Sequence, residues 1–151
     1  AATHLALLRK TELDVLMGAG RFTLLDQSAA AELFPLCLSR GVAVELASPF
    51  NSGILATGPD DPATRFDYQR PTEQTQTKVR AIQTICASHD VTLKRAALHY
   101  SALPQAVTRL VLGLISAEGL RSNLDDLAAP PPSALWSDLA ELGIPTPIGE
   151  T

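Results

Sequence analysis

Three short, largely apolar runs lie in this chain at residues 14–19, 42–47 and 108–113, and polar residues or glycine flank each of them. Apolar runs of this length are typical of strands that are buried on both faces of a parallel sheet. Around these runs, apolar residues recur every three or four positions, which predicts helices. The predicted helices cover residues 1–10, 29–40, 72–88, 92–103, 117–127 and 132–142. Because strands and helices alternate, the chain is expected to fold as parallel β/α units of the α/β class.

Serine and glycine residues mark the expected helix boundaries. Ser28 and Ser116 are placed to cap the helices that follow them, and Gly41 is placed to end the first of these. Residues 57–71 carry several prolines and no regular period, which predicts a long surface loop of the kind that often has a function. The first ten residues have the pattern of a helix tail, whereas Pro145–Thr151 is expected to leave the last helix without packing, as a genuine C-terminus.

Length and composition bound the class of protein. A chain of 151 residues suits one domain, and 46% apolar with 19% charged residues is typical of a folded chain. No apolar run reaches the roughly 18 residues that a membrane span needs. A net charge of −4 offers no basic surface for a nucleic acid, so we expect neither a membrane nor a nucleic acid as partner. Cys37 and Cys86 lie in helical patterns and are predicted to be buried free thiols, which favours the reducing cytoplasm.

Candidate binding chemistry gathers where the predicted strands end, because ligands of parallel α/β folds bind beyond the carboxyl ends of strands. Residues 48–53 (Ser-Pro-Phe-Asn-Ser-Gly) combine a stiff proline turn with an aromatic ring, two hydroxyls and an amide. Arg21 directly follows the first strand and could hold an anion or a carbonyl oxygen, and the helix start at Ser116 favours a phosphate. The structural alternatives are a proline-stiffened strand exit, a surface arginine and an ordinary helix start.

Other reactive side chains lack the spacing of a catalytic or metal site. We predict structural roles for His4, His89 and His99, and no spacing among histidines, cysteines and carboxylates indicates zinc. The pairs Asp60-Asp61 and Asp125-Asp126 are expected to be solvated charge. The residues by themselves therefore predict a site for a phosphate-bearing ligand, and no metal site or catalytic centre.

Three sequence motifs, or strings, lie at the strand exits, one after each predicted strand. Residues 20–27 are Gly-Arg-Phe-Thr-Leu-Leu-Asp-Gln, residues 48–55 are Ser-Pro-Phe-Asn-Ser-Gly-Ile-Leu, and residues 113–116 (Gly-Leu-Ile-Ser) lead to Arg-Ser-Asn at 121–123. The strings resemble the aromatic-x-Leu-Leu-Asp turn, the Ser-Pro-Leu-x-x-Gly-x-Leu signature and the last strand exit of the aldo-keto reductases. The similarity points to the branch that oxidises L-fucose, D-threo-aldoses or L-galactose.

The resemblance implies a fold and a division of labour. It implies that residues 1–151 are the C-terminal portion of a single (β/α)8 TIM barrel domain, with about its last three strands and no internal boundary. It also implies that the family's catalytic tyrosine, lysine, aspartate and histidine belong to the first half of the barrel. No catalytic residue is therefore assigned within this chain.

A nicotinamide dinucleotide is the cofactor that the resemblance implies. Together with Arg21, the residues expected to bind it are Ser48, Phe50, Asn51, Ser52, Gly113, Leu114, Ser116, Leu120 and Asn123. Ser48 and residues 50–52 would border the pyrophosphate and the nicotinamide ribose, and the residues from Gly113 onward would border the adenosine end. Ala47 stands where many members stack an aromatic ring on the nicotinamide, and Ser122 replaces a usual glutamate. Residues 114–116 lack the cation that grips the 2′-phosphate of NADP, and the nearest is Arg121, which favours NAD, with NADP as the alternative.

The expected function is oxidation of a free aldose at C1 to a lactone, with this chain supplying the cofactor-binding half. One alternative is a dehydrogenase or reductase of another small alcohol or aldehyde, such as pyridoxal. The other is a non-catalytic barrel that acts as a binding or regulatory subunit. The expected partners are the dinucleotide, a small sugar, and either the N-terminal half of the barrel or another copy of the chain.

Overall fold

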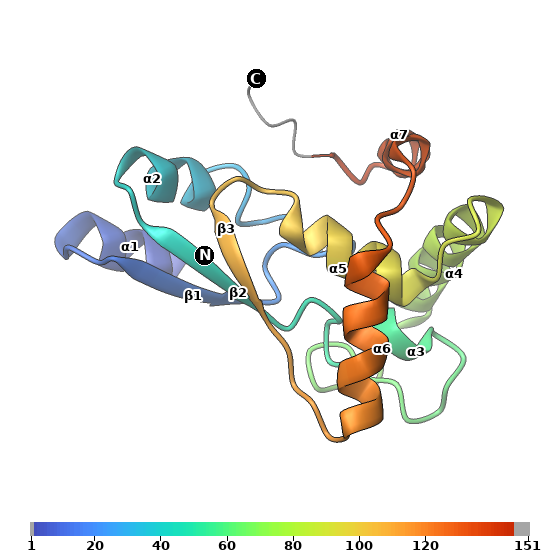
Figure 1. Cartoon of the computed structure of the whole chain (residues 1–151). Coiled ribbons are helices and arrows are strands. Elements are labelled where there is room, and N and C mark those ends of the chain that lie inside the picture. Colours follow the sequence, from blue (N-terminus) through green and yellow to red (C-terminus); the bar gives the residue numbers. More distant parts are fainter. Residues whose placement is uncertain (1, 147–151) are drawn as a thin grey trace.

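A single parallel sheet organises residues 2–146, the part of the chain that the computed structural model describes (Figure 1). In sheet order, its strands are β1 (Val15–Ala19), β2 (Ala43–Ala47) and β3 (Val107–Val111). Ala47 is paired with Ala19 on one side and with Val111 on the other, so the three strands end side by side. The predicted α/β class with parallel strands is confirmed.

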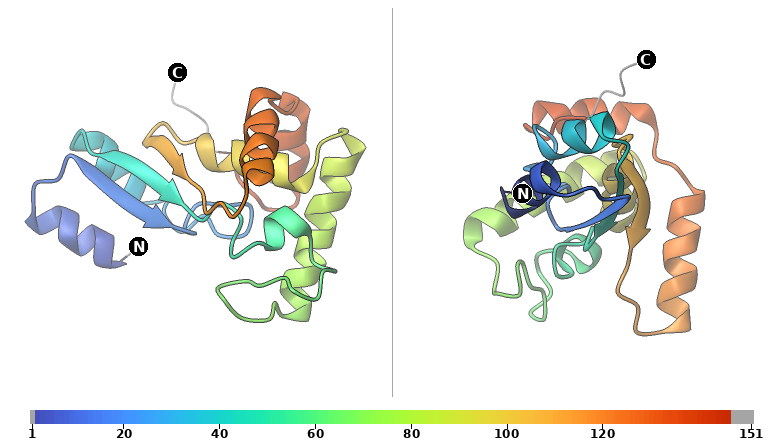
Figure 2. Two further views of the ribbon diagram at one scale, coloured as in Figure 1. Left: turned by 60° about the horizontal axis from the view of Figure 1, so that its bottom comes forward. Right: turned by 90° about the vertical axis from the view of Figure 1, so that its left-hand side faces the viewer.

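Helices connect and flank the strands. They are α1 (Ala2–Lys10), α2 (Leu33–Ser39), α3 (Ile54–Thr57), α4 (Glu73–Ser88), α5 (Leu93–Ala102), α6 (Ala117–Ala128) and α7 (Ser133–Glu141). Figures 1 and 2 show α1 and α2 at one end of the molecule and α4, α6 and α7 at the other. The short helix α3 was not predicted; it ends at Thr57, where the predicted loop of residues 57–71 begins.

The core packs against one face of the sheet. Leu16 in β1 and Leu46 in β2 belong to one buried cluster with Leu8 in α1 and Phe34 in α2. The cluster extends to α5, where the ring of Tyr100 stacks parallel to that of Phe22, with ring centres 5.0 Å apart. Stacked aromatic pairs stabilise a fold beyond the area that they bury.

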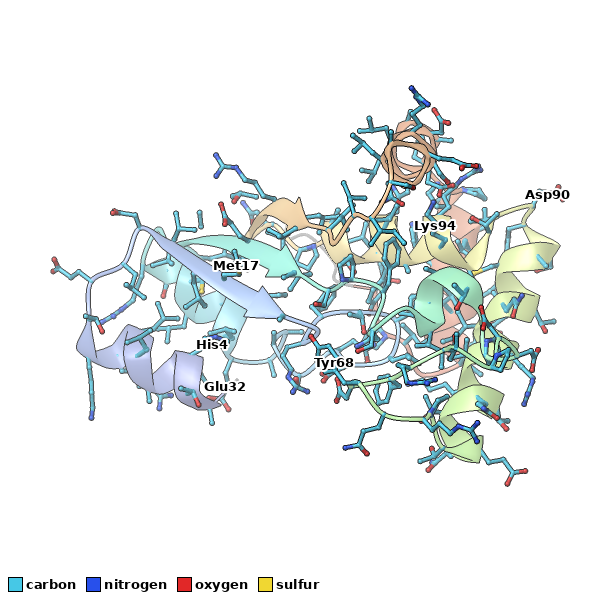
Figure 3. All side chains as sticks on the ribbon, turned by 90° about the horizontal axis from the view of Figure 1, so that it is seen from below. His4, Met17, Glu32, Tyr68, Asp90 and Lys94 are labelled. Atoms are coloured by element: carbon cyan, nitrogen blue, oxygen red, sulfur yellow. The ribbon has the colours of Figure 1, made fainter. Side chains whose placement is uncertain are left out.

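The prediction that the strands are buried on both faces is wrong for the described chain. Along β1, Leu16 is buried, but Val15 and Met17 on the opposite face are exposed, Met17 by 53% (Figure 3). The same open face carries an ion pair, in which Arg109 Nη1 lies 2.8 Å from Glu45 Oε1. The reason is geometric: these helices cover only the outer face, and the other face of a barrel sheet is covered only when the barrel closes.

Helix α2 begins later than predicted, and Ser28 does not cap it. The residue before the helix is Glu32, which makes no side-chain cap. The backbone N–H of Ser28 instead donates to Asp26 Oδ1 at 2.8 Å, within a turn. Pro35 accounts for the late start, because proline lacks an N–H and fits only the first turn of a helix, where that group has no partner anyway.

Other predicted boundaries hold. The hydroxyl of Ser116 accepts a hydrogen bond from the N–H of Gly119 at 3.0 Å and so caps α6. Gly41 follows the end of α2 with a φ of 67°, a conformation that favours glycine.

The segment after α7 packs further than predicted. The hydroxyl of Tyr100 donates to the carbonyl oxygen of Pro145 at 2.6 Å, and Thr146 donates to the carbonyl oxygen of Trp136 at 3.3 Å. A buried phenol needs an acceptor, and Pro145 supplies it. The expectation of a non-packing end is therefore wrong for Pro145 and Thr146, while residues 147–151 lie outside the described residues.

Both cysteines are free and buried, as predicted. Burial disfavours a thiolate, so it raises the pKa of Cys37 and raises that of Cys86 to about 11. Among the described residues, no cluster of His, Cys, Asp or Glu has the geometry to hold a metal ion. Nor does any described helix have the length and apolar character needed to cross a membrane.

Candidate functional site

Two of the predicted loops meet where β1 and β2 end. The N–H of Gly20, just after β1, donates to the carbonyl oxygen of Ala47, the last residue of β2, at 3.0 Å. Gly20 has a φ of 64°, and a side chain added there would meet the amide nitrogen of Asn51 at 3.6 Å. That distance is an ordinary van der Waals contact, so glycine is favoured at this position by its left-handed backbone and not by lack of space.

The exit of β2 is a tight turn in unusual backbone conformations. The N–H of Asn51 donates to the carbonyl oxygen of Ser48 at 3.2 Å, and that of Gly53 to Phe50 at 3.0 Å. Ser48, Asn51 and Ser52 have positive φ values of 58°, 46° and 61°. Positive φ is uncommon outside glycine and costs on the order of 1–3 kcal/mol per residue, and such strain concentrates at binding and catalytic sites.

Asn51 is the most informative side chain of this turn. It is 2% exposed, and its Oδ1 atom is buried without a hydrogen-bond partner. A buried polar atom without a partner costs about 1–3 kcal/mol, so native folds rarely keep one without a reason. An amide at a strand exit with a free acceptor is placed to receive a donor from a ligand.

The long segment after β2 folds back onto this turn. Gly53 forms a bridge with Arg65, and the hydroxyl of Ser52 accepts a hydrogen bond from the N–H of Tyr68 at 3.1 Å. Thr64 fixes the base of the segment by donating to the carbonyl oxygen of Gly58 at 2.8 Å. The sequence predicts a functional loop here but does not single out Tyr68, whose only signal is an aromatic residue in a polar stretch.

Arg21 contacts an internal partner. Its Nη1 atom lies 2.9 Å from Oδ2 of Asp26, and its side chain stays about half exposed. Burial raises the pKa of Asp26, but hydrogen bonds from Ser28 and the charge of Arg21 outweigh that effect and hold the pKa below its ordinary value. The carboxylate of Asp26 is thus kept charged, and a role for Arg21 toward the cofactor stays a prediction.

The third loop leads from β3 into α6. Gly113, Leu114 and Ser116 are exposed beyond the end of β3, and Leu120 is exposed on the first turns of α6. Asn123, in contrast, is buried. Because β2 and β3 are paired up to their last residues, this loop leaves the same edge of the sheet as the turn at 48–53.

Polar contacts hold α6 to α5, and they overturn one expectation. Asp126 was expected to be solvated with Asp125, but its side chain is only 12% exposed; Lys94 Nζ lies 2.9 Å from Oδ2 and Arg95 Nε lies 3.4 Å from Oδ1. Adjacent helix residues point in different directions, so only Asp125 faces solvent. The pair Asp60-Asp61 is exposed as predicted.

The histidines lie away from the strand exits. His99 Nε2 contacts the carbonyl oxygen of Asp126 at 3.0 Å, and His89 Nε2 contacts Oδ2 of Asp138 at 2.7 Å. His4 belongs to α1, where its Nδ1 atom is buried without a hydrogen-bond partner among the described residues. The structure thus brings together the predicted residues of the first two loops, and the third loop beside them, without a histidine among them.

A hollow of about 650 Å³ lies at the opposite end of the strands. Residues 9–14 line it together with Arg40 and Val42. These residues precede β1 and β2, whereas parallel α/β folds bind ligands after their strands, so we assign this hollow no role.

Known proteins share this arrangement. The sequence pattern of the Aldo/keto reductase family matches residues 2–143. The chain belongs to this family. Among curated proteins, it is 36% identical over 140 residues to D-threo-aldose 1-dehydrogenase of Pseudomonas sp, covering 92% of the chain and 43% of that protein. It is 33% identical over 137 residues to pyridoxal 4-dehydrogenase of Microbacterium luteolum, covering 91% of the chain and 40% of that protein.

Solved aldo-keto reductases confirm the fold. The chain superimposes on the holo form of AKR11C1 from Bacillus halodurans with a TM-score of 0.69 at 19% identity, covering 99% of the chain and 49% of that structure. The apo form gives the same TM-score at 20% identity. The three-stranded sheet is thus part of an aldo-keto reductase barrel, and the chain spans less than half the length of the curated relatives that it matches.

Proposed function

We propose that the whole protein oxidises a free aldose at C1 to a lactone with a nicotinamide dinucleotide, and that residues 1–151 supply the cofactor-binding half. Membership of the aldo/keto reductase family supports oxidoreductase chemistry on a small substrate. The similarity to D-threo-aldose 1-dehydrogenase favours a sugar, and the similarity to pyridoxal 4-dehydrogenase keeps pyridoxal as the second candidate.

The observation that carries this proposal is the buried, unpartnered amide oxygen of Asn51 at the exit of β2. A dinucleotide offers ribose hydroxyls and a carboxamide N–H as donors to such an acceptor, whereas its phosphates only accept hydrogen bonds. The hydroxyls of Ser48 and Ser52 on the same turn can donate to the phosphates. The residues at this strand exit therefore fit the cofactor's mixture of donors and acceptors.

The chain's own contribution is binding and orientation. The turn at 48–53 would hold the pyrophosphate and the nicotinamide ribose, and the start of α6 at Ser116 would hold the adenosine side. A bound nicotinamide would supply the acceptor for a hydride from C1, and the C1 hydroxyl would lose its proton as the lactone carbonyl forms. We assign the group that takes this proton to the half of the barrel outside this chain.

Turnover by the whole protein tests the proposal. Purified protein is mixed with NAD and, separately, with L-fucose, L-galactose, a D-threo-aldose and pyridoxal. NADH formation is followed by absorbance, and products are identified by mass spectrometry. We expect an aldonolactone and a kcat/KM for the best aldose at least about tenfold above that for pyridoxal. The reverse order would move the proposal to pyridoxal, and dinucleotide binding without turnover of any substrate would indicate a binding subunit.

A further inference from the structure

An unusual hairpin turn lies against the exit of β2. Phe66 and Gln69 exchange both backbone hydrogen bonds, at 2.9 and 3.0 Å, which leaves Asp67 and Tyr68 as the two turn residues. Their φ values are 48° and 64°. Two-residue turns with positive φ at both positions strongly favour Asn-Gly or Asp-Gly. A tyrosine at the second position therefore holds a strained backbone that a glycine would relieve.

The ring of Tyr68 makes little contact with the described fold that could offset this strain. Its residue is 87% exposed, whereas Phe66, two positions earlier, packs against the core. Phe66 thus anchors the hairpin, and the turn projects the aromatic ring of Tyr68 away from the core. Exposed tyrosines on rigid turns are effective contact residues, because few torsions are lost on binding.

The hairpin also fixes the hydroxyl of Ser52. Because Ser52 Oγ accepts the N–H of Tyr68 at 3.1 Å, its own proton remains free to donate elsewhere. The bridge between Gly53 and Arg65 attaches the hairpin to the same turn at a second point. Through its hydrogen bond to Ser52, Tyr68 lies at the exit of β2, where the candidate site lies, and Figure 3 shows it on the side of the molecule toward which the arrow of β1 points.

We propose that Tyr68 is a cofactor-contact residue whose ring covers the nicotinamide ribose and the pyrophosphate next to Ser52. This inference rests on the proposed function. The ring would shield the apolar face of the ribose from water, and the phenol would donate a hydrogen bond to a phosphate oxygen, since a neutral tyrosine is a donor to an anion. Ser52, oriented by the Tyr68 N–H, would donate to the same phosphate group.

Calorimetric titrations of the whole protein with NAD, ADP-ribose and AMP test the inference. Tyr68→Asn removes the ring but keeps a residue that tolerates positive φ and donates the N–H to Ser52, so the turn is expected to survive. Tyr68→Phe removes only the hydroxyl. Gln69→Ala, which changes an exposed neighbour, is the matched control, and circular dichroism checks the fold of each variant.

Tyr68→Asn is expected to raise the Kd for NAD and ADP-ribose by about 5- to 30-fold, the range for a tyrosine that dominates a contact, and to leave AMP unchanged. Tyr68→Phe should fall between Tyr68→Asn and the wild type, and Gln69→Ala should match the wild type. Unchanged affinity for NAD in Tyr68→Asn, or a raised KM for sugar alone, would overturn the inference and leave the proposed function intact. A wild-type protein that binds no dinucleotide would overturn both.

Discussion

Asn51 is the residue on which the proposed cofactor site depends most. Its amide is buried at a strand exit, its backbone is left-handed, and its oxygen has no partner. Asparagine adopts the left-handed conformation more readily than most other residues, so the conformation of Asn51 alone would not indicate a site. The combination with an unpaired buried acceptor does, because that acceptor lowers stability until a donor binds it.

Asn51→Ala is expected to weaken NAD binding by about 1–3 kcal/mol, or roughly 5- to 150-fold in Kd, because one or two hydrogen bonds to the dinucleotide are lost. His99→Ala is expected to leave the Kd unchanged, since His99 contacts Asp126 and not the strand exit. Calorimetric titration of both variants, with circular dichroism to confirm their fold, makes the comparison. A larger loss in His99→Ala than in Asn51→Ala would contradict the assignment of this turn.

At the scale of elements, a polar clamp holds α6 to α5: Lys94 and Arg95 of α5 both contact the carboxylate of Asp126 in α6. We expect Asp126→Asn to destabilise the whole protein by about 1–3 kcal/mol, because Lys94 and Arg95 keep their charges in a mostly buried contact that has lost its counter-charge. Asp125→Asn is the matched control, being exposed, and should change stability by less than about 0.5 kcal/mol. Urea unfolding measures both; equal stabilities for the two variants would show that the clamp is not stabilising.

The loop between β3 and α6 bears on the choice of cofactor. Residues 113–116 carry no cation, and a 2′-phosphate with nearly two negative charges needs one, so NAD is expected to be preferred over NADP. The ratio of kcat/KM for the two cofactors at saturating sugar is the measurement. A preference for NADP of about tenfold or more would show that Arg121, or a residue outside this chain, supplies the charge.

Element boundaries followed from the sequence where local chemistry determines them. The strands and the cap at Ser116 could be predicted because apolar runs and capping hydroxyls act within a few residues. The start of α2 could have been predicted too, since Pro35 must lie in the first turn of the helix. Ser28, however, has the stronger sequence pattern of a helix cap, and it indicates an earlier start. The burial of Asp126 could not, because it depends on Lys94 and Arg95 in another helix.

At the scale of the whole molecule, the sheet within residues 2–146 has two free edges and one open face. Val15 and Met17 are exposed on that face, beside the ion pair of Glu45 and Arg109. The alternation along β1 is hidden in the sequence, because both sides of a barrel strand are apolar when the barrel is closed. The contact between Ser52 and Tyr68 was equally hidden, since it joins two irregular segments.

Residues 1–151 alone are not expected to form a stable monomer, because free edges and an uncovered apolar face favour association or loose packing. Thermal unfolding monitored by circular dichroism, with size measured by light scattering, tests this expectation. We expect a broad transition, aggregation, or assembly with another copy. A cooperative transition of a monomer would contradict it.

The central claim is that this chain forms the cofactor-binding half of an aldo-keto reductase, and a crystal structure of the whole protein with bound NAD tests it most directly. The account predicts the pyrophosphate and nicotinamide ribose against residues 48–53, with a donor on Asn51 Oδ1, and the adenosine end along residues 113–123. A dinucleotide bound clear of both segments, or an Asn51 oxygen still unpaired in the complex, would contradict the account.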